Sequence, residues 1–359
     1  MTIYTDLHQI FSLTANYKNC LYVTVSNNEF NLNNTGSQLL TYLKTVNAKR
    51  IIKNNSFLEL KDVECLYQNS KINNVDCIIA IGDDTVMNSA KFIALAFSNN
   101  LNSLKQIANN QNNLKNSINM IFVPTTCGSG VEATDTAFIF DNKKSISISD
   151  NSLIPNNIIL DPNLLENMPP TICHSCYLDA LSQAIESMWS INATLQSIKY
   201  AKDAIKYILN ALSNYSYNTC GFWNNLQQGA FLSGQAVNIA KTVLPHAISE
   251  SLTAYYQIPH GLSVFITLPE IVKLFNIQSL STVYNDLYTL FNVNNISELQ
   301  QKLKAIMSDD GKCHTTLNKY GLHNNSDTSL IASETVVSKN YPITISKSQI
   351  ETILNAILD

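Results

Sequence analysis

The stretch VDCIIAIGDDTVMNSAKFIALAFS, residues 75–98, determines the fold that we expect for this chain. Its first eight residues are almost all apolar, and they are long enough for one strand that is buried on both faces. Asp83 and Asp84 then form a polar turn, and residues 85–98 follow an apolar pattern of helical period. A strand, a tight turn and a helix in this order predict one unit of a parallel sheet with helices on its faces.

The same rhythm continues on both sides of this stretch. CLYVTV (20–25) reads as a buried strand and SQLLTYLKTV (37–46) as the helix after it, while NMIFVPTT (119–126) reads as a further strand. Ligands of open parallel sheets lie at the carboxyl ends of the strands. We therefore expect a binding crevice at residues 82–86 and 125–130.

The second half of the chain has a different pattern. After residue 162 the apolar residues recur with helical period, as in 171–188, 194–213 and 263–276. A length of 359 residues is sufficient for two domains of ordinary size. We predict an α/β domain with a parallel sheet over residues 1–162 and an all-α domain over residues 163–359.

Two pairs of polar side chains lie at helical spacing within this apolar half. Asp179 and Gln183 are four residues apart, and so are His246 and Glu250, while His260 follows in a Pro-His-Gly turn. Residues four apart share one face of a helix. Two such faces and a loop histidine can surround one divalent cation. The alternative is a polar cluster that only holds two helices together.

Composition limits the partners and the compartment. The 23 basic and 27 acidic residues give a net charge of −4, so no basic surface for nucleic acid is expected. Eight cysteines are scattered, and the one C-x-x-C motif, at Cys173 and Cys176, has no second motif to complete a zinc ribbon. There is no signal-like start and no run of the ~20 apolar residues that a membrane helix needs. We expect a cytoplasmic protein that binds neither nucleic acid nor membranes.

Five longer stretches resemble a known superfamily. They are IIAIGDDTVMNSAK, PTTCGSGVEATDTAFI, KKSISISDNSLIPNNIILDPNLLENMPP, LDALSQAIES and PHAISESLTAYYQIPHG. In their order and spacing they resemble the iron-containing (group III) alcohol dehydrogenases, which have a dehydroquinate synthase-like fold. Within that superfamily, SQAIESMWSINAT and NIAKTVLPHAISESLTAYYQIPHGLSVFITLPE most resemble the phosphonoacetaldehyde reductases.

The resemblance implies an NAD(P)H-dependent oxidoreductase that forms a homodimer or a larger homo-oligomer. It implies a Rossmann-like cofactor domain, a helical metal domain, and Fe²⁺ or Zn²⁺ in the cleft between them. By position, the implied metal ligands are Asp179, Gln183, His246 and His260. The implied cofactor contacts are Gly82, Asp83, Asp84, Thr85, Thr125, Thr126 and Lys144. His260 and Glu250 are the implied catalytic residues for proton transfer.

The chain also departs from the pattern of the family. Gln183 stands where the family usually has a histidine, and Glu250 can be a further ligand, a proton relay or a solvated residue. The turn Gly82-Asp83-Asp84-Thr85 replaces a run of glycines that lets backbone N–H groups approach a diphosphate. Carboxylates at this turn repel a diphosphate, so the dinucleotide binds differently or is not bound. Asn88 and Val25 replace the Asp and the Gly of the family.

Three hypotheses follow. The first is a metal-dependent reductase of a small aldehyde, with phosphonoacetaldehyde, reduced to 2-hydroxyethylphosphonate, as one candidate and Lys241 as a partner of the phosphonate. The second keeps the metal but performs non-redox, metal-assisted chemistry. The third is a non-catalytic paralogue.

Overall fold

The computed structural model describes residues 1–25, 38, 41–42, 48–52, 58–70, 74–109, 114–142, 144–308, 314–337 and 339–359. The predicted helix at 37–46 lies largely outside these residues. The chain divides into two compact units: Met1–Met168 with Tyr215–Gln227, and Pro169–Asn214 with Gln228–Asp359. The predicted domain boundary near residue 162 stays a prediction. The two units are groups of residues in spatial contact, and the first of them also includes Tyr215–Gln227 from later in the sequence.

The first unit contains a sheet of six described strands, in the order β1-β8-β5-β4-β2-β3. They are β1 (Thr2–Tyr4), β2 (Cys20–Thr24), β3 (Ala48–Ile52), β4 (Cys77–Gly82), β5 (Asn119–Pro124) and β8 (Asn157–Ile159). Every pairing in this sheet is parallel. Gly82 lies opposite Pro124, so β4 and β5 end at the same edge. The predicted α/β class is confirmed.

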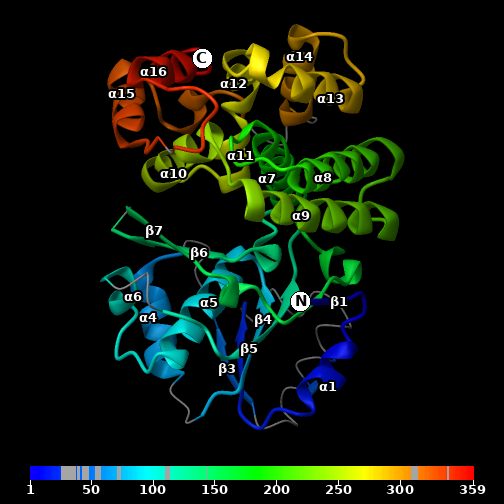
Figure 1. Ribbon diagram of the computed structural model, residues 1–359, viewed down its shortest axis with the longest axis vertical. Coiled ribbons are helices and arrows are strands. Elements are labelled where there is room, and N and C mark those ends of the chain that lie inside the picture. Colours follow the sequence, from blue (N-terminus) through cyan, green and yellow to red (C-terminus); the bar gives the residue numbers. More distant parts are fainter. Residues whose placement is uncertain are drawn as a thin grey trace. The chain divides into compact units, whose positions relative to one another are not determined.

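Both faces of this sheet are buried, as the continuous apolar strands predicted. Ile78 and Phe122 point into one core together with residues of α4 (Leu60–Asn69) and α5 (Asp84–Ser98). Ile79 and Ile121 point into a second core that includes Ile10 of α1 (Gln9–Thr14). Figure 1 shows α4 and α5 on one side of the sheet and α1 on the other.

A buried lysine fixes the segment that follows β5. Lys91 of α5 has no exposed surface, and its ammonium group donates to the carbonyl oxygens of Val131, Thr134 and Thr136 at 2.7–2.9 Å. Thr136 begins β6 (Thr136–Asp141), which pairs antiparallel with β7 (Lys144–Ser149). Lys91 therefore attaches the loop after β5, and the start of this hairpin, to the helix that follows β4.

The second unit is helical, as predicted. Every residue of α7 (Pro170–Trp189) from Tyr177 onward is buried, which is typical of a helix at the centre of a bundle. It packs against α8 (Leu195–Asn214) and α11 (His260–Phe265). The other long helices of this unit include α10 (Leu244–Tyr256), α13 (Ser281–Phe291), α14 (Ile296–Ser308), α15 (Asn325–Glu334) and α16 (Lys347–Asn355). The helix α9 (Cys220–Ala240) belongs to this unit from Gln228 onward.

The prediction of one helix over 263–276 is wrong. The segment forms the end of α11 and a separate helix α12 (Leu268–Leu274), with Pro269 in the first turn of α12. Proline has no N–H to donate, and its ring clashes with the carbonyl four residues earlier, so a continuous helix is interrupted there. Among the described residues, none of the helices combines the length and apolar character that crossing a bilayer requires.

Candidate metal centre

Three side chains from three helices of the second unit converge on one point. They are Asp179 of α7, His246 of α10 and His260 of α11. Each offers one ligand atom, and these atoms lie within 4.8 Å of one another. Asp179 Oδ1 lies 3.3 Å from His246 Nε2 and 3.9 Å from His260 Nε2. Donors that share one tetrahedral Zn²⁺ at ~2.0–2.2 Å are about 3.4 Å apart, so the spacing suits one ion.

Asp179 carries the clearest sign that a partner belongs here. Its Oδ1 atom is buried, and its neighbours are the imidazole nitrogens of His246 and His260, neither of which makes a well-formed hydrogen bond to it. A buried polar oxygen without a partner is costly, and a carboxylate is more costly still. An ion bound by this oxygen and the two imidazole nitrogens removes that penalty. The donor set, one carboxylate and two imidazoles, is one that Fe²⁺ and Zn²⁺ both accept.

The electrostatics of the three groups point the same way. Burial opposes ionisation of Asp179, but the charges of His260 and His246 hold its pKa below the usual range. Burial also opposes a charge on His246, yet Glu186 and Asp179 raise its pKa to about 10. Burial lowers the pKa of His260. The cluster therefore favours a positive charge beside Asp179, which is the charge that a cation provides.

Gly261 allows the two helices that carry Asp179 and His260 to approach closely. A Cβ atom at this position would lie 1.8 Å from the Ser175 carbonyl oxygen and 3.0 Å from Asp179 Cβ. Any other residue would force the backbones of α7 and α11 apart. The Pro-His-Gly sequence thus combines a candidate ligand with the close approach that brings it to Asp179.

Gln183, the fourth predicted ligand, is buried one turn after Asp179 on the same helix. Its carbonyl oxygen lies 3.1 Å from the Ser233 hydroxyl, and its side chain also hydrogen-bonds the Asp179 carboxylate. Because a carboxylate only accepts, the amide nitrogen is the donor to Asp179. In this arrangement Gln183 supports Asp179. Glu250 lies one turn after His246, is exposed, and is outside the three-residue group.

The predicted cofactor residues lie in the first unit, at the carboxyl edge of the sheet. The Thr125 N–H donates to the Gly82 carbonyl at 2.9 Å, which joins the two predicted turns. Thr125 and Thr126 are partly exposed there. Lys144 is placed differently, since it is exposed at the start of β7, opposite Asp141 in the separate hairpin.

Asp83 occupies the N-terminus of α5. Its carboxylate accepts from the Val86 N–H at 3.1 Å and from the Thr85 hydroxyl at 2.7 Å. These are donors of the kind that a phosphate group uses at a helix N-terminus. Both bonds turn the Asp83 carboxylate back onto its own helix. One N–H group of the first turn of α5 is therefore already bonded within the protein.

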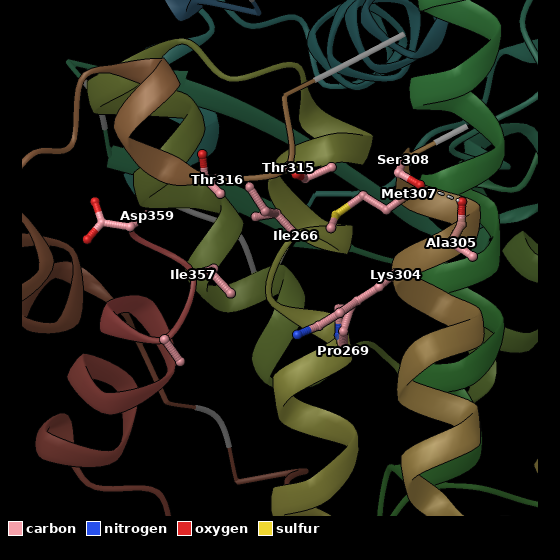
Figure 2. A pocket seen from close by; sticks show the side chains of 11 residues that line it. Ile266, Pro269, Lys304, Ala305, Met307, Ser308, Thr315, Thr316, Ile357 and Asp359 are labelled. Atoms are coloured by element: carbon pink, nitrogen blue, oxygen red, sulfur yellow. Dashed lines mark hydrogen bonds between the residues drawn. The ribbon is translucent and has the colours of Figure 1, made fainter. Parts of the chain in front are cut away.

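A cavity of about 380 Å³ lies elsewhere in the second unit (Figure 2). Its walls include Lys304, whose ammonium lies 2.8 Å from Glu270, and Thr316, whose hydroxyl donates to Asn318. None of the predicted site residues lines it. Its polar groups are satisfied by neighbours, so the three-residue cluster is the stronger candidate site.

Comparison with known families agrees with this arrangement. Residues 5–162 match the family described as "Iron-containing alcohol dehydrogenase", and residues 174–358 match "Fe-containing alcohol dehydrogenase family, C-terminal". The chain belongs to the iron-containing alcohol dehydrogenase family.

Curated relatives within the iron-containing alcohol dehydrogenases are distant. Phosphonoacetaldehyde reductase of Streptomyces viridochromogenes is 29% identical over 208 residues, which cover 55% of this chain and 53% of that protein. Lactaldehyde reductase of Escherichia coli is 25% identical over 249 residues, covering 68% and 63%. The chain thus spans about half the length of the first of these relatives.

Solved structures extend the likeness to the whole chain. Sulfoacetaldehyde reductase from Bifidobacterium kashiwanohense, solved in complex with NAD+, aligns with a TM-score of 0.86 at 19% identity, over 99% of this chain and 96% of that one. Alcohol dehydrogenase from Oenococcus oeni aligns with a TM-score of 0.87 at 21% identity, over 99% and 97%. At these identities the likeness establishes the iron-containing alcohol dehydrogenase fold.

One residue of this centre was missed by sequence reasoning. Glu186 has no exposed surface, and its carboxylate lies 2.6 Å from His246 Nδ1. The signal was present, because Glu186 follows Asp179 by seven residues and therefore lies on the same face of α7.

Proposed function

We propose that the chain is an NAD(P)H-dependent, metal-dependent reductase of a small aldehyde. One observation carries the proposal: the buried Asp179 Oδ1 atom accepts no well-formed hydrogen bond and faces two imidazole nitrogens. A structural polar cluster would satisfy that oxygen internally. Membership of the iron-containing alcohol dehydrogenase family supports the same conclusion.

Asp179, His246 and His260 would hold the ion, either Fe²⁺ or Zn²⁺. When bound, it supplies a Lewis acid that polarises a carbonyl oxygen. Asp179 balances part of its charge, and His246 is fixed by Glu186. Reduction adds a hydride to the carbonyl carbon and a proton to its oxygen. The His260 side chain is 40% exposed, so it can exchange protons with solvent, and we assign the proton path to His260 or Glu250.

The dinucleotide would be held at the carboxyl edge of the parallel sheet. Support comes from the general position of ligands in such sheets and from the meeting of the Gly82 and Thr125 turns. Thr85 and Thr126 would contribute hydroxyl groups beside Asp83 and Asp84. Lys144 stays a proposed contact.

The proposed substrate is a short aldehyde, with phosphonoacetaldehyde, which would give 2-hydroxyethylphosphonate, as the first candidate. Lys241, the proposed partner of an anionic group, has a backbone φ of +64° and is partly buried. Neighbouring contacts hold this strained turn: the Ser190 hydroxyl donates to the Ala240 carbonyl, and the Val243 N–H donates to Glu186. Backbone strain at a fixed turn is often found at binding sites. We further propose a cytoplasmic homo-oligomer.

The test loads the metal-free protein with Fe²⁺ or Zn²⁺ and measures NADH and NADPH oxidation with a panel of aldehydes with and without anionic groups. We expect metal-dependent turnover that a chelator abolishes and that Asp179→Asn lowers by at least about a hundredfold. Absence of both metal binding and dinucleotide binding would contradict the proposal.

A second candidate rests on the carboxylates at the cofactor turn. Asp83 and Asp84 disfavour a diphosphate, and this favours non-redox, metal-assisted chemistry or a non-catalytic paralogue. A protein that binds metal but neither NADH nor NADPH at millimolar concentration would support non-redox chemistry. A protein that binds none of them would support the paralogue.

A further inference from the structure

Glu186 is a fully buried carboxylate, and its hydrogen bonds all go to residues at the start of α10. Its Oε1 atom lies 2.6 Å from His246 Nδ1. Its Oε2 atom accepts from the Val243 N–H at 2.8 Å and from the His246 N–H at 3.4 Å. Two of these donors belong to the residue that carries a metal-ligating nitrogen.

The location of this charge is difficult to explain by packing alone. Burying a carboxylate costs several kcal/mol unless its partners compensate it. Here the compensation comes from one imidazole and from N–H groups at the first turn of α10, which has no side-chain cap of its own. The helix N-terminus also favours a negative charge. The start of α10 and His246 thus stabilise the buried charge of Glu186, and Glu186 in turn caps α10 and orients the His246 ring.

The same geometry separates the roles of the two nitrogens of His246. Nδ1 donates to the Glu186 carboxylate, and Nε2 faces Asp179 at 3.3 Å, where a metal ion would take the place of a proton. Asp179 and Glu186 lie seven residues apart on α7 and contact opposite sides of one imidazole ring. Ligating histidines are commonly oriented in this way by a carboxylate on the far nitrogen.

We propose that Glu186 is a positioning residue of the metal centre, which holds the His246 ring with Nε2 toward the ion and fixes the first turn of α10. The proposal rests on the metal centre of the proposed function. It is independent of the dinucleotide and of the aldehyde.

The test is a Co²⁺ titration of the metal-free protein, followed by the visible absorption of the bound ion. Glu186→Gln preserves side-chain volume but removes the charge and leaves one oxygen where the carboxylate accepted from three donors. We expect the Kd for Co²⁺ to rise by roughly ten- to a hundredfold and the absorption spectrum to change. The control is Ser187→Ala, since Ser187 is buried beside Glu186 and its hydroxyl donates to the Ala184 carbonyl within α7. This variant is expected to match the wild-type Kd and spectrum.

The outcomes separate the two proposals. A folded Glu186→Gln protein with the Kd and spectrum of the wild type would overturn the role of Glu186 and leave the metal centre intact. A wild-type protein that binds no Co²⁺, Zn²⁺ or Fe²⁺ would overturn the metal centre, and this inference with it.

A measurement on the unmodified protein covers the case in which the variant does not fold. In the Zn²⁺-loaded protein, nitrogen-15 NMR of the histidine rings identifies the protonated and the metal-bound nitrogen. We expect Nδ1 of His246 to be protonated and Nε2 to bind the metal. The reverse assignment would refute the proposal.

Discussion

Replacement of Asp83 by asparagine separates the stability of α5 from the charge at the cofactor turn. Asparagine caps a helix about as well as aspartate, so the bond to the Val86 N–H is retained and stability should change by less than about 0.5 kcal/mol. The negative charge is lost. Because the carboxylate lies 3.1 Å from that N–H, a phosphate oxygen bound at the same turn would be near it.

The size of the effect follows from that distance. Two like charges ~4 Å apart repel by about 4 kcal/mol at an effective dielectric constant of ~20. Solvent and salt reduce this at a partly exposed turn, and we expect a gain of about 1.4–2.8 kcal/mol, which is a tenfold to hundredfold tighter Kd. The difference between variant and wild type should shrink as ionic strength rises.

Nicotinamide fluorescence during titration with NADH and NADPH measures the Kd directly. The matched control is Asp150→Asn, because Asp150 also caps a turn in the first unit, accepting from the Ser152 N–H at 2.8 Å, but precedes β8 at the amino edge. Thermal unfolding of both variants tests whether the caps are retained. The reasoning is refuted if Asp83→Asn and Asp150→Asn bind the cofactor with the wild-type affinity.

Three other changes test the two units separately. Lys91→Met removes the ammonium donor that the carbonyl groups of Val131, Thr134 and Thr136 share and should cost about 1–3 kcal/mol in urea unfolding. The exposed Lys61→Met should change little, and equal stabilities of the two variants would contradict the role of Lys91. Burial raises the pKa of Glu132 from 4.5 to about 7, so the folded state favours its neutral form and loses up to about 3 kcal/mol as pH rises from 4.5 to 7. Unfolding measured between pH 4.5 and 7 should show no such loss of stability in Glu132→Gln, whereas the exposed Glu334→Gln should lose stability as the wild type does. A dependence of stability on pH that Glu132→Gln leaves unchanged would disprove the assignment. Gln183→His should tighten Zn²⁺ binding at least about tenfold, because imidazole is the better donor; an unchanged Kd by chelator competition would mean that this side chain points away from the ion.

The sheet was predictable where apolar runs are continuous. The strands expected at 75–82 and 119–126 are observed at Cys77–Gly82 and Asn119–Pro124, and only their ends differ. β3 was missed because AKRII contains two basic residues, which an edge strand accommodates and an apolar pattern does not reveal. The three residues of β1 are too short for any periodic signal.

The side chains that would bind the metal could be predicted from the sequence, but the residue that positions one of them could not. Asp179 and His246, each four residues before a second polar residue on its helix, and His260 in its turn are three side chains that the structure brings together. Glu186 resembled an ordinary helical glutamate, because nothing local shows that α10 begins beside it. Only the tertiary contact distinguishes a buried support from a solvated charge.

The distances in the centre depend most on a residue with no donor atom. His260 Nε2 and Asp179 Oδ1 are 3.9 Å apart, already somewhat wider than the roughly 3.4 Å that one tetrahedral ion spans. A side chain at 261 would have to relieve a contact of 1.8 Å with the backbone of Ser175, so α11 would move away from α7 by more than an ångström. That movement would separate the two donors beyond the reach of one ion. Gly261 therefore determines whether His260 is a ligand, and the Pro-His-Gly sequence is best understood as a packing requirement and a ligand encoded together.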